Sequence, residues 1–165
     1  REFYKSKISD NWEKLIVYLP PCVPSAGLPV LYLQHGFGES EISWSTTGKV
    51  NLLMDNLIAA GKIKPFAIVM GNGMVKQRID GELKLNRALY GQMLVEEILP
   101  MLEKKYQFGG SKEKRGMAGL SMGSVQTTRI ICEHPELFSE VGIFSGFLRD
   151  RIVGDEEHDL SLIHI

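Results

Sequence analysis

Gly119-Leu120-Ser121-Met122-Gly123 is the stretch that decides the fold. It follows a short apolar run at residues 115–119, typical of a strand, and it opens a segment of helical character at residues 122–133. A serine between a strand and a helix, with glycine at the second position on either side, is the pattern of a nucleophile elbow. Because the turn is sharp and its backbone strained, the flanking residues must lack bulk. The stretch therefore predicts that Ser121 is an exposed nucleophile.

The pentapeptide is weak support when it stands alone, because a glycine-rich chain can contain it by accident. This chain holds 17 glycines in 165 residues. The rest of the sequence therefore has to supply the strands, helices and loops that such an elbow needs.

Length and composition indicate one globular domain with a sizeable core. The 165 residues are 44% hydrophobic and 24% charged. A net charge of −1 gives no electrostatic case for a nucleic-acid or anionic membrane partner, and no apolar run reaches transmembrane length. Cys22 and Cys132 lack metal-ligand spacing, so we expect two free thiols and no metal site; a disulfide between them is the less favoured alternative.

Apolar runs alternate with amphipathic segments along the chain, which predicts a parallel α/β sheet. Gly61 is placed to cap one helix, and Pro100 predicts a kink or a restart in another. A charged, irregular loop is expected at residues 74–84. The expected strands are residues 13–19, 29–34, 65–70, 115–119 and 140–145, and the expected helices are residues 50–60, 86–106 and 122–133.

A second glycine motif, His35-Gly36-Phe37-Gly38, directly follows the expected strand at 29–34. Where a serine elbow hydrolyses esters, the loop after a central strand supplies one backbone N–H to the oxyanion hole, and the residue after the serine supplies the other. The candidate donors are therefore the N–H groups of Phe37 and Met122. The alternative is that Gly36 and Gly38 only turn the chain at the end of the strand.

Several separate motifs in one order resemble the esterase D type esterases. That group includes the family 1 carbohydrate esterases (feruloyl and acetylxylan esterases) and enterobactin-esterase-like enzymes. The likeness spans about residues 11–147, and its motifs are residues 35–39 with Trp44, then 55–58, 69–73, 119–123 and 144–146. It implies an α/β-hydrolase fold, three αβα layers around a mostly parallel sheet, and ester hydrolysis by a Ser-His-Asp triad without metal or organic cofactor.

By this resemblance Ser121 matches the nucleophile, and the N–H groups of Phe37 and Met122 match the oxyanion donors. His35 precedes Ser121, whereas the triad order is serine, acid, histidine, so we expect His35 to orient the loop by hydrogen bonds. The glycines that support these motifs are Gly36, Gly38, Gly119 and Gly123.

Three further residues have two interpretations each. For Trp44, packing of its loop onto the sheet is favoured, and contact with the substrate is the alternative. For Asn72, a turn role is favoured over substrate contact. Ser124 stands where the family more often has glycine, and its small side chain is expected to be tolerated.

The triad acid and histidine have no clear match, because in the family they follow further strands beyond residue 147. Asp150 or Asp155 with His158 has the right order, but the three lie in one charged segment, so a solvated tail is expected. His134 is interpreted as a helix-end residue. Residues 1–159 are therefore interpreted as an α/β-hydrolase domain that is incomplete at its C-terminus. Residues 160–165 match what a common sequencing adapter would encode and are interpreted as a non-native tail.

The sequence thus predicts a serine carboxylic ester hydrolase that works through an acyl-enzyme on feruloyl or acetyl esters of plant polysaccharide. Alternatives are a siderophore triester, a small thioester such as S-formylglutathione, or acyl transfer to an alcohol. A non-catalytic binding module of the same fold is the alternative of another class. The expected partner is a small or polysaccharide-linked ester, and a polysaccharide substrate would imply a secreted or periplasmic protein. Without acid and base, the chain alone is expected to be largely inactive.

Overall fold

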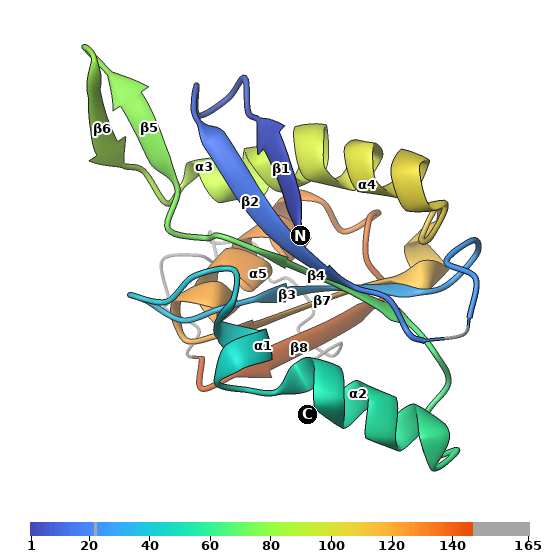
Figure 1. The fold of residues 1–165 in the computed structure, drawn as a ribbon. Helices are drawn as coiled ribbons and strands as arrows, with labels where there is room; N and C mark the ends of the chain where they lie inside the picture. The colour runs from blue at the N-terminus through green and yellow to red at the C-terminus, as the bar shows by residue number, and fades with distance from the viewer. Residues whose placement is uncertain (22, 147–165) are drawn as a thin grey trace.

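A computed structural model describes residues 1–21 and 23–146, and a six-stranded sheet with the order β1-β2-β4-β3-β7-β8 forms its centre (Figure 1). Strands β4, β3, β7 and β8 run parallel, as predicted, while β1 and β2 pair antiparallel at one edge. The strands are β1 (Glu2–Lys5), β2 (Trp12–Tyr18), β3 (Val30–Gln34), β4 (Ala67–Gly71), β7 (Arg115–Leu120) and β8 (Glu140–Phe144).

Helices cover both faces of this sheet and make three layers (Figure 1). One face carries α3 (Leu89–Met93), a π-helical turn (Leu94–Ile98), α4 (Leu99–Tyr106) and α5 (Met122–Glu133). The other face carries α1 (Ser43–Thr46) and α2 (Val50–Ala59). A 3₁₀ turn (Lys112–Lys114) leads into β7. Among the described residues, no helix combines the length and apolar character needed to cross a membrane.

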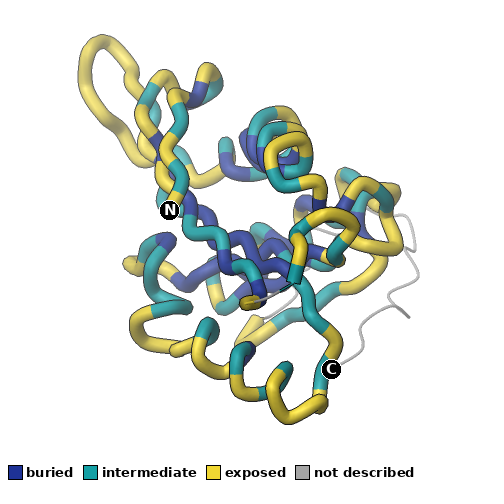
Figure 2. Tube along the Cα trace, turned by 45° about the vertical axis from the view of Figure 1, so that its right-hand side comes forward, coloured by how far each residue is buried: buried dark blue, intermediate teal, exposed yellow. Residues whose placement is uncertain are grey.

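The buried strands explain why continuous apolar runs predicted this sheet. In β4, Ala67 and Val69 belong to the apolar cluster under α3–α5, whereas Ile68 and Met70 belong to the cluster under α2. Alternate side chains of a strand point to opposite faces, so a strand covered on both faces must be apolar throughout. The buried residues accordingly follow the central strands (Figure 2).

The predicted helices are confirmed with small changes in their ends. The structure places α5 at the predicted residues, and α2 ends at Ala59 with Gly61 at a positive φ of 65° just beyond it. The expected helix at 86–106 begins at Leu89 and runs without a break to Tyr106, with the π-helical turn Leu94–Ile98 directly before Pro100. The junction residues keep right-handed helical angles, so a π-helical turn takes the place of the restart that Pro100 predicted.

The expectation of an irregular loop at residues 74–84 was wrong. The segment forms a two-stranded antiparallel hairpin of β5 (Lys76–Ile79) and β6 (Glu82–Leu85), which projects from the body of the molecule (Figure 1). Asp80 and Gly81 form its turn with φ of 51° and 82°. Two central residues with positive φ are the requirement of a type I′ hairpin turn, and Asp-Gly is a strong sequence signal for it. Strand β1 and helix α1 were also not predicted.

Candidate active site

Ser121 lies between the last residue of β7 and the first residue of α5 and is exposed. Its φ of 52° and ψ of −111° are unfavourable for a residue with a side chain. Two hydrogen bonds hold the turn: the Ser121 N–H donates to the Phe144 carbonyl at 2.9 Å, and the Ser121 carbonyl accepts from the Ser124 N–H at 2.9 Å. The Ser124 hydroxyl donates to the same carbonyl at 2.6 Å, which gives that side chain a structural role.

The two flanking glycines are required by close packing of the turn. A Cβ atom at Gly119 would overlap the carbonyl group of Gly123. A Cβ atom at Gly123 would lie 2.7 Å from the His35 carbonyl oxygen and 2.8 Å from the Gln34 Cβ atom. Any larger residue would push α5 away from the ends of β3 and β7. The glycine spacing that suggested an elbow is therefore a direct consequence of how the helix is seated on the sheet.

The loop after β3 is held in shape by its own hydrogen bonds. The Glu39 carboxylate accepts from the Gly36 N–H at 2.7 Å, and the Glu39 N–H donates to the Gly36 carbonyl at 3.3 Å. Gly38 has a φ of 79°. Within residues 1–21 and 23–146, neither the Phe37 N–H nor the Met122 N–H donates to a protein acceptor.

His35 is buried, and both of its ring nitrogens are engaged. Nε2 accepts from the Gly73 N–H at 3.0 Å, so Nδ1 must carry the proton, and Nδ1 lies 2.7 Å from the Gly36 carbonyl oxygen. The ring thereby ties the loop after β3 to the turn after β4. This arrangement agrees with an orienting role for His35 and leaves neither nitrogen free to take a proton from Ser121.

A cavity of about 570 Å³ opens beside Ser121. Ser121, Phe37 and Met122 contribute to its lining, together with residues 85–88 and several side chains of α5. The guanidinium carbon of Arg87 lies 5.3 Å from the centre of the Phe37 ring. Arg129 also lines the cavity, and no carboxylate is among its described lining residues.

Gln126 joins two segments beside this cavity, and no sequence motif marks it. Its side-chain amide donates from α5 to the Gly73 carbonyl at 3.0 Å and to the Arg87 carbonyl at 3.2 Å. Residues 85–88 are thereby attached to the helix that begins after Ser121. Neither Arg87 nor Gln126 belongs to a motif, so only the tertiary contact identifies them.

Trp44 packs against the apolar cluster under α2 and does not line the cavity beside Ser121. Its indole N–H donates to the Gln34 carbonyl at 3.0 Å, and its ring meets Phe144 edge-on with centroids 6.2 Å apart. Contact of Trp44 with a substrate stays a prediction. Asn72 adopts the expected turn, because its side-chain oxygen accepts from the Met74 N–H at 3.0 Å.

The described residues hold no base for Ser121. His134 lies at the C-terminal end of α5, about 20 Å from Ser121 at the rise of a helix, and its Nδ1 is 3.6 Å from Glu136. The other candidates, Asp150, Asp155 and His158, lie outside the described residues, as does the segment 160–165. The described residues contain no cluster of three or more metal-ligating side chains. Cys132 is an exposed free thiol, whereas Cys22 lies outside the described residues.

A strained serine at a strand–helix turn, two backbone N–H groups without acceptors among the described residues and an adjoining cavity form the arrangement that the motifs predicted. Residues 6–158 match the model of the Putative esterase family, and the chain belongs to this family. A relative from Xylanibacter ruminicola, an endo-1,4-beta-xylanase/feruloyl esterase, is 45% identical over 119 residues, which are 72% of this chain and 16% of the relative.

Solved structures agree with this assignment. A ferulic acid esterase superimposes with a TM-score of 0.73 and 30% identity over 85% of this chain and 56% of its own. A CE1 ferulic acid esterase from Anaeromyces mucronatus, solved with ferulic acid, superimposes with a TM-score of 0.77 and 23% identity over 88% of this chain and 56% of its own. The latter likeness shows the fold alone. The chain spans little more than half the length of these structures.

Proposed function

We propose that this chain carries the nucleophile and oxyanion donors of a serine esterase that cleaves feruloyl esters of plant polysaccharide. The observation that carries the proposal is the elbow at Ser121, whose exposed hydroxyl faces a cavity shared with Phe37 and Met122. The relative that is 45% identical combines a feruloyl esterase with a xylanase by name, which supports a polysaccharide-linked ester as substrate.

In the proposed reaction, the Ser121 hydroxyl attacks the ester carbonyl and loses its proton to a base. The negative charge on the tetrahedral oxygen is stabilised by the Phe37 and Met122 N–H groups and by the N-terminus of α5. Departure of the sugar hydroxyl leaves an acyl-enzyme, which water cleaves to free the acid and restore Ser121. The base that takes the proton lies outside residues 1–146.

The size and lining of the cavity favour a substrate with an aromatic acyl group over a substrate with an acetyl group. The cavity volume of about 570 Å³ far exceeds the volume of an acetyl group, and Phe37 contributes an exposed aromatic ring to the lining. Arg87 beside that ring gives a planar cation that can stack on an electron-rich hydroxycinnamoyl ring. A hydroxycinnamoyl ester therefore uses contacts that an acetyl ester leaves unfilled.

The test is hydrolysis of methyl ferulate by the longest open reading frame that contains these residues. We expect hydrolysis that Ser121→Ala abolishes and a preference for methyl ferulate over methyl acetate that Arg87→Ala reduces. A fluorophosphonate probe should label Ser121 in the wild-type protein. Hydrolysis that survives Ser121→Ala would show that Ser121 is not the nucleophile. A protein that neither hydrolyses the ester nor reacts with the probe would favour the non-catalytic binding module.

A further inference from the structure

A second cavity lies away from Ser121, beside the N-terminal end of β2. It has a volume of about 200 Å³ and shares no lining residue with the first cavity. The side chains that matter are Trp12, Glu13 and Lys14 of β2, Glu41 ahead of α1, Asn72 after β4, and Lys76 of β5. We propose that this cavity binds one sugar unit of a glycan chain.

Glu41 contributes to this cavity a carboxylate that can accept hydrogen bonds from a ligand. Its side chain belongs to a residue only 9% exposed, and no donor among the described residues hydrogen-bonds to its carboxylate. The nearby Glu39 differs, because its carboxylate already accepts from the Gly36 N–H. Hydroxyl groups of a bound sugar would supply Glu41 with the donors it lacks.

Trp12 supplies an apolar surface at the same cavity. It is 66% exposed although it is one of the largest apolar side chains in the chain, and it lies on a β-strand that fixes its backbone. A flat indole ring can stack on the C–H face of a pyranose or furanose ring while carboxylates and amides hold the hydroxyl groups. Trp12 and Glu41 together therefore offer both kinds of contact that a sugar ring presents.

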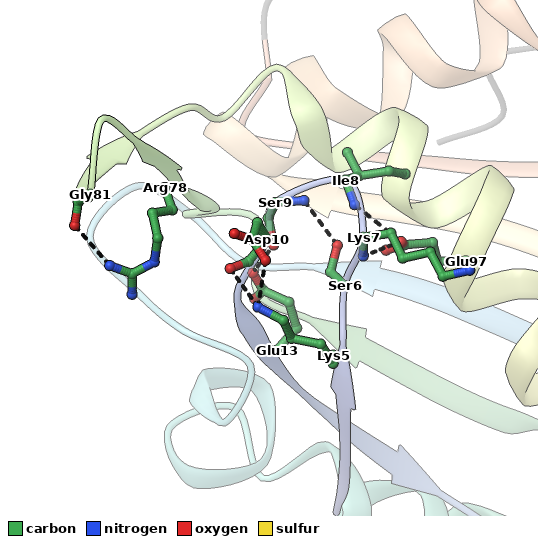
Figure 3. Close-up of polar contacts among 10 residues, drawn as sticks. All are labelled: Lys5, Ser6, Lys7, Ile8, Ser9, Asp10, Glu13, Arg78, Gly81 and Glu97. Carbon is green, nitrogen blue, oxygen red and sulfur yellow. Dashed lines mark hydrogen bonds and ion pairs between the residues drawn. The ribbon is translucent and has the colours of Figure 1, made fainter.

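Glu13 braces the wall of this cavity, because its side chain points to the face of β2 opposite to Trp12 and is tied to the β1–β2 connection. The Ser9 hydroxyl donates to its carboxylate at 2.9 Å within the turn between β1 and β2 (Figure 3). Glu97 of the π-helical turn holds the same β1–β2 connection by accepting from the Lys7 N–H at 2.7 Å and the Ile8 N–H at 3.3 Å (Figure 3). The wall that carries Glu13 is therefore held in place before any ligand binds.

The charges of the lining favour a neutral polyol over an ion. Two carboxylates would disfavour an anion, and Lys14 and Lys76 would disfavour a cation. No group of three metal-ligating side chains occurs in the described part of the chain. Carboxylate acceptors alternating with ammonium and amide donors suit the hydroxyl groups of a sugar, each of which both donates and accepts.

The position of this cavity relates it to the elbow. Leu15 of β2 pairs with Gly71 of β4, so the start of β2 lies beside the turn that follows the carboxyl end of β4. Ser121 follows the carboxyl end of β7, and only β3 separates β7 from β4. At about 4.8 Å per strand, the lateral separation is on the order of 10 to 15 Å, which a short oligosaccharide spans. This coupling to the ester rests on the proposed function, whereas sugar binding itself does not.

The test is calorimetric titration of the full chain with xylohexaose, which contains no ester. We expect binding that Trp12→Ala weakens at least tenfold and that the isosteric Glu41→Gln weakens several-fold. Phe3→Ala is the matched control, because Phe3 is a 57% exposed aromatic residue on the neighbouring strand that lines neither cavity. Ser121→Ala should leave xylohexaose binding unchanged.

The outcomes separate the two proposals. Absence of xylohexaose binding, or equal weakening by Trp12→Ala and Phe3→Ala, overturns the sugar site. Unchanged binding in both Trp12→Ala and Glu41→Gln overturns it as well, and circular dichroism of each variant verifies the fold. None of these results depends on ester hydrolysis, whereas failure of methyl ferulate hydrolysis would reject the esterase proposal alone.

Discussion

At the scale of the residue, the Ser121 turn exists because the residues on either side of the serine lack side chains. A methyl group at Gly123 would lie 2.7 Å from the His35 carbonyl oxygen, and both are backbone-anchored atoms that cannot move independently. The positive φ of Ser121 adds backbone strain that the surrounding hydrogen bonds must hold. The strained backbone of the Ser121 turn is thus maintained by the tight packing of α5 against the sheet.

Gly123→Ala should therefore destabilise the protein by about 2 to 4 kcal/mol, because the overlap can be relieved only by shifting α5 or the end of β3. Urea unfolding measures this loss. Gly61→Ala is the matched control: Gly61 has a φ of 65°, but an added Cβ there has no neighbour within 4 Å, so only backbone strain of about 1 kcal/mol is expected. Equal losses in both variants would contradict a packing requirement at the elbow.

The Glu39 carboxylate gives a second prediction at this scale. Glu39→Ala removes the acceptor of the Gly36 N–H, and the loop that presents the Phe37 N–H loses its internal brace. We expect a stability loss of about 1 to 2 kcal/mol. For the proposed hydrolysis of methyl ferulate, kcat should fall more than KM rises, because displacing the proposed oxyanion donor acts on the transition state. A change in KM alone would mean that Glu39 does not position that donor.

At the scale of the element, β7 is the strand that carries Ser121, and a partly buried ion pair fixes its start. The Glu103 carboxylate of α4 accepts from Arg115 Nε at 2.6 Å and from a second guanidinium nitrogen at 2.7 Å. It also accepts from the Gly110 N–H at 3.0 Å. This pair raises the pKa of Arg115, chiefly because its guanidinium hydrogen-bonds to Glu103. The bidentate contact joins α4 to β7.

Glu103→Ala should destabilise the protein by about 2 to 4 kcal/mol, because it leaves the Arg115 guanidinium and the Gly110 N–H without their acceptor. Chemical denaturation of Glu103→Ala, of Arg115→Met and of the double variant Glu103→Ala/Arg115→Met gives the coupling free energy between the two side chains. The double variant should regain part of the loss, because it removes the unpaired charge. If the two single losses simply add, the contact contributes little to stability.

The β5–β6 hairpin shows why some elements escaped prediction. Its strands are short and almost entirely exposed: β5 shows no apolar alternation, and the alternation of β6 covers only four residues, too few to identify a strand. Only the Asp80-Gly81 dipeptide marks the turn, and charged residues around it suggested a loop. The buried strands and α5 were predictable because burial on both sides of a strand, or on one side of a helix, imposes a pattern on the sequence itself.

Gly81→Ala tests the turn. Gly81 has a φ of 82°, so alanine should cost the hairpin about 1 kcal/mol even though the space around it is open. Because the hairpin projects from the body of the molecule, the loss should appear as faster amide exchange in β5 and β6, with little change in global unfolding. Asp80→Asn keeps a residue that tolerates positive φ and should leave exchange unchanged.

At the scale of the whole molecule, the motifs predicted the elbow and the loop at residues 35–38, but they could not predict how the walls of the cavity meet. The contact between Gln126 and the Arg87 carbonyl joins segments far apart in the sequence, and neither residue type is unusual where it stands. The same holds for Trp12 and Glu41, which the sheet order brings to one cavity. Long-range geometry of this kind leaves no local pattern.

Two carboxyl groups near the β1–β2 edge should make the stability of the whole molecule depend on pH in opposite directions. Burial raises the pKa of Glu13, so its charged form opposes folding, and its contribution to stability is lost as pH rises through that pKa. Hydrogen bonds from Lys105 and then Tyr106 lower the pKa of Glu2, so its contribution is present above its unfolded value and is lost as pH falls.

Glu13→Gln should therefore raise the urea midpoint at pH 7, because glutamine keeps the acceptor for the Ser9 hydroxyl but carries no buried charge. Glu2→Gln should lower that midpoint, because it removes the charged partner of Lys105 at 2.7 Å. The Glu13→Gln difference should shrink as the pH falls through the raised pKa of Glu13 and be gone near pH 4, whereas the Glu2→Gln difference should persist to about pH 4 and shrink only below it. Midpoints measured from pH 3 to 8 distinguish the two variants, and a shift of the same sign in both would show that burial does not govern the charge of Glu13.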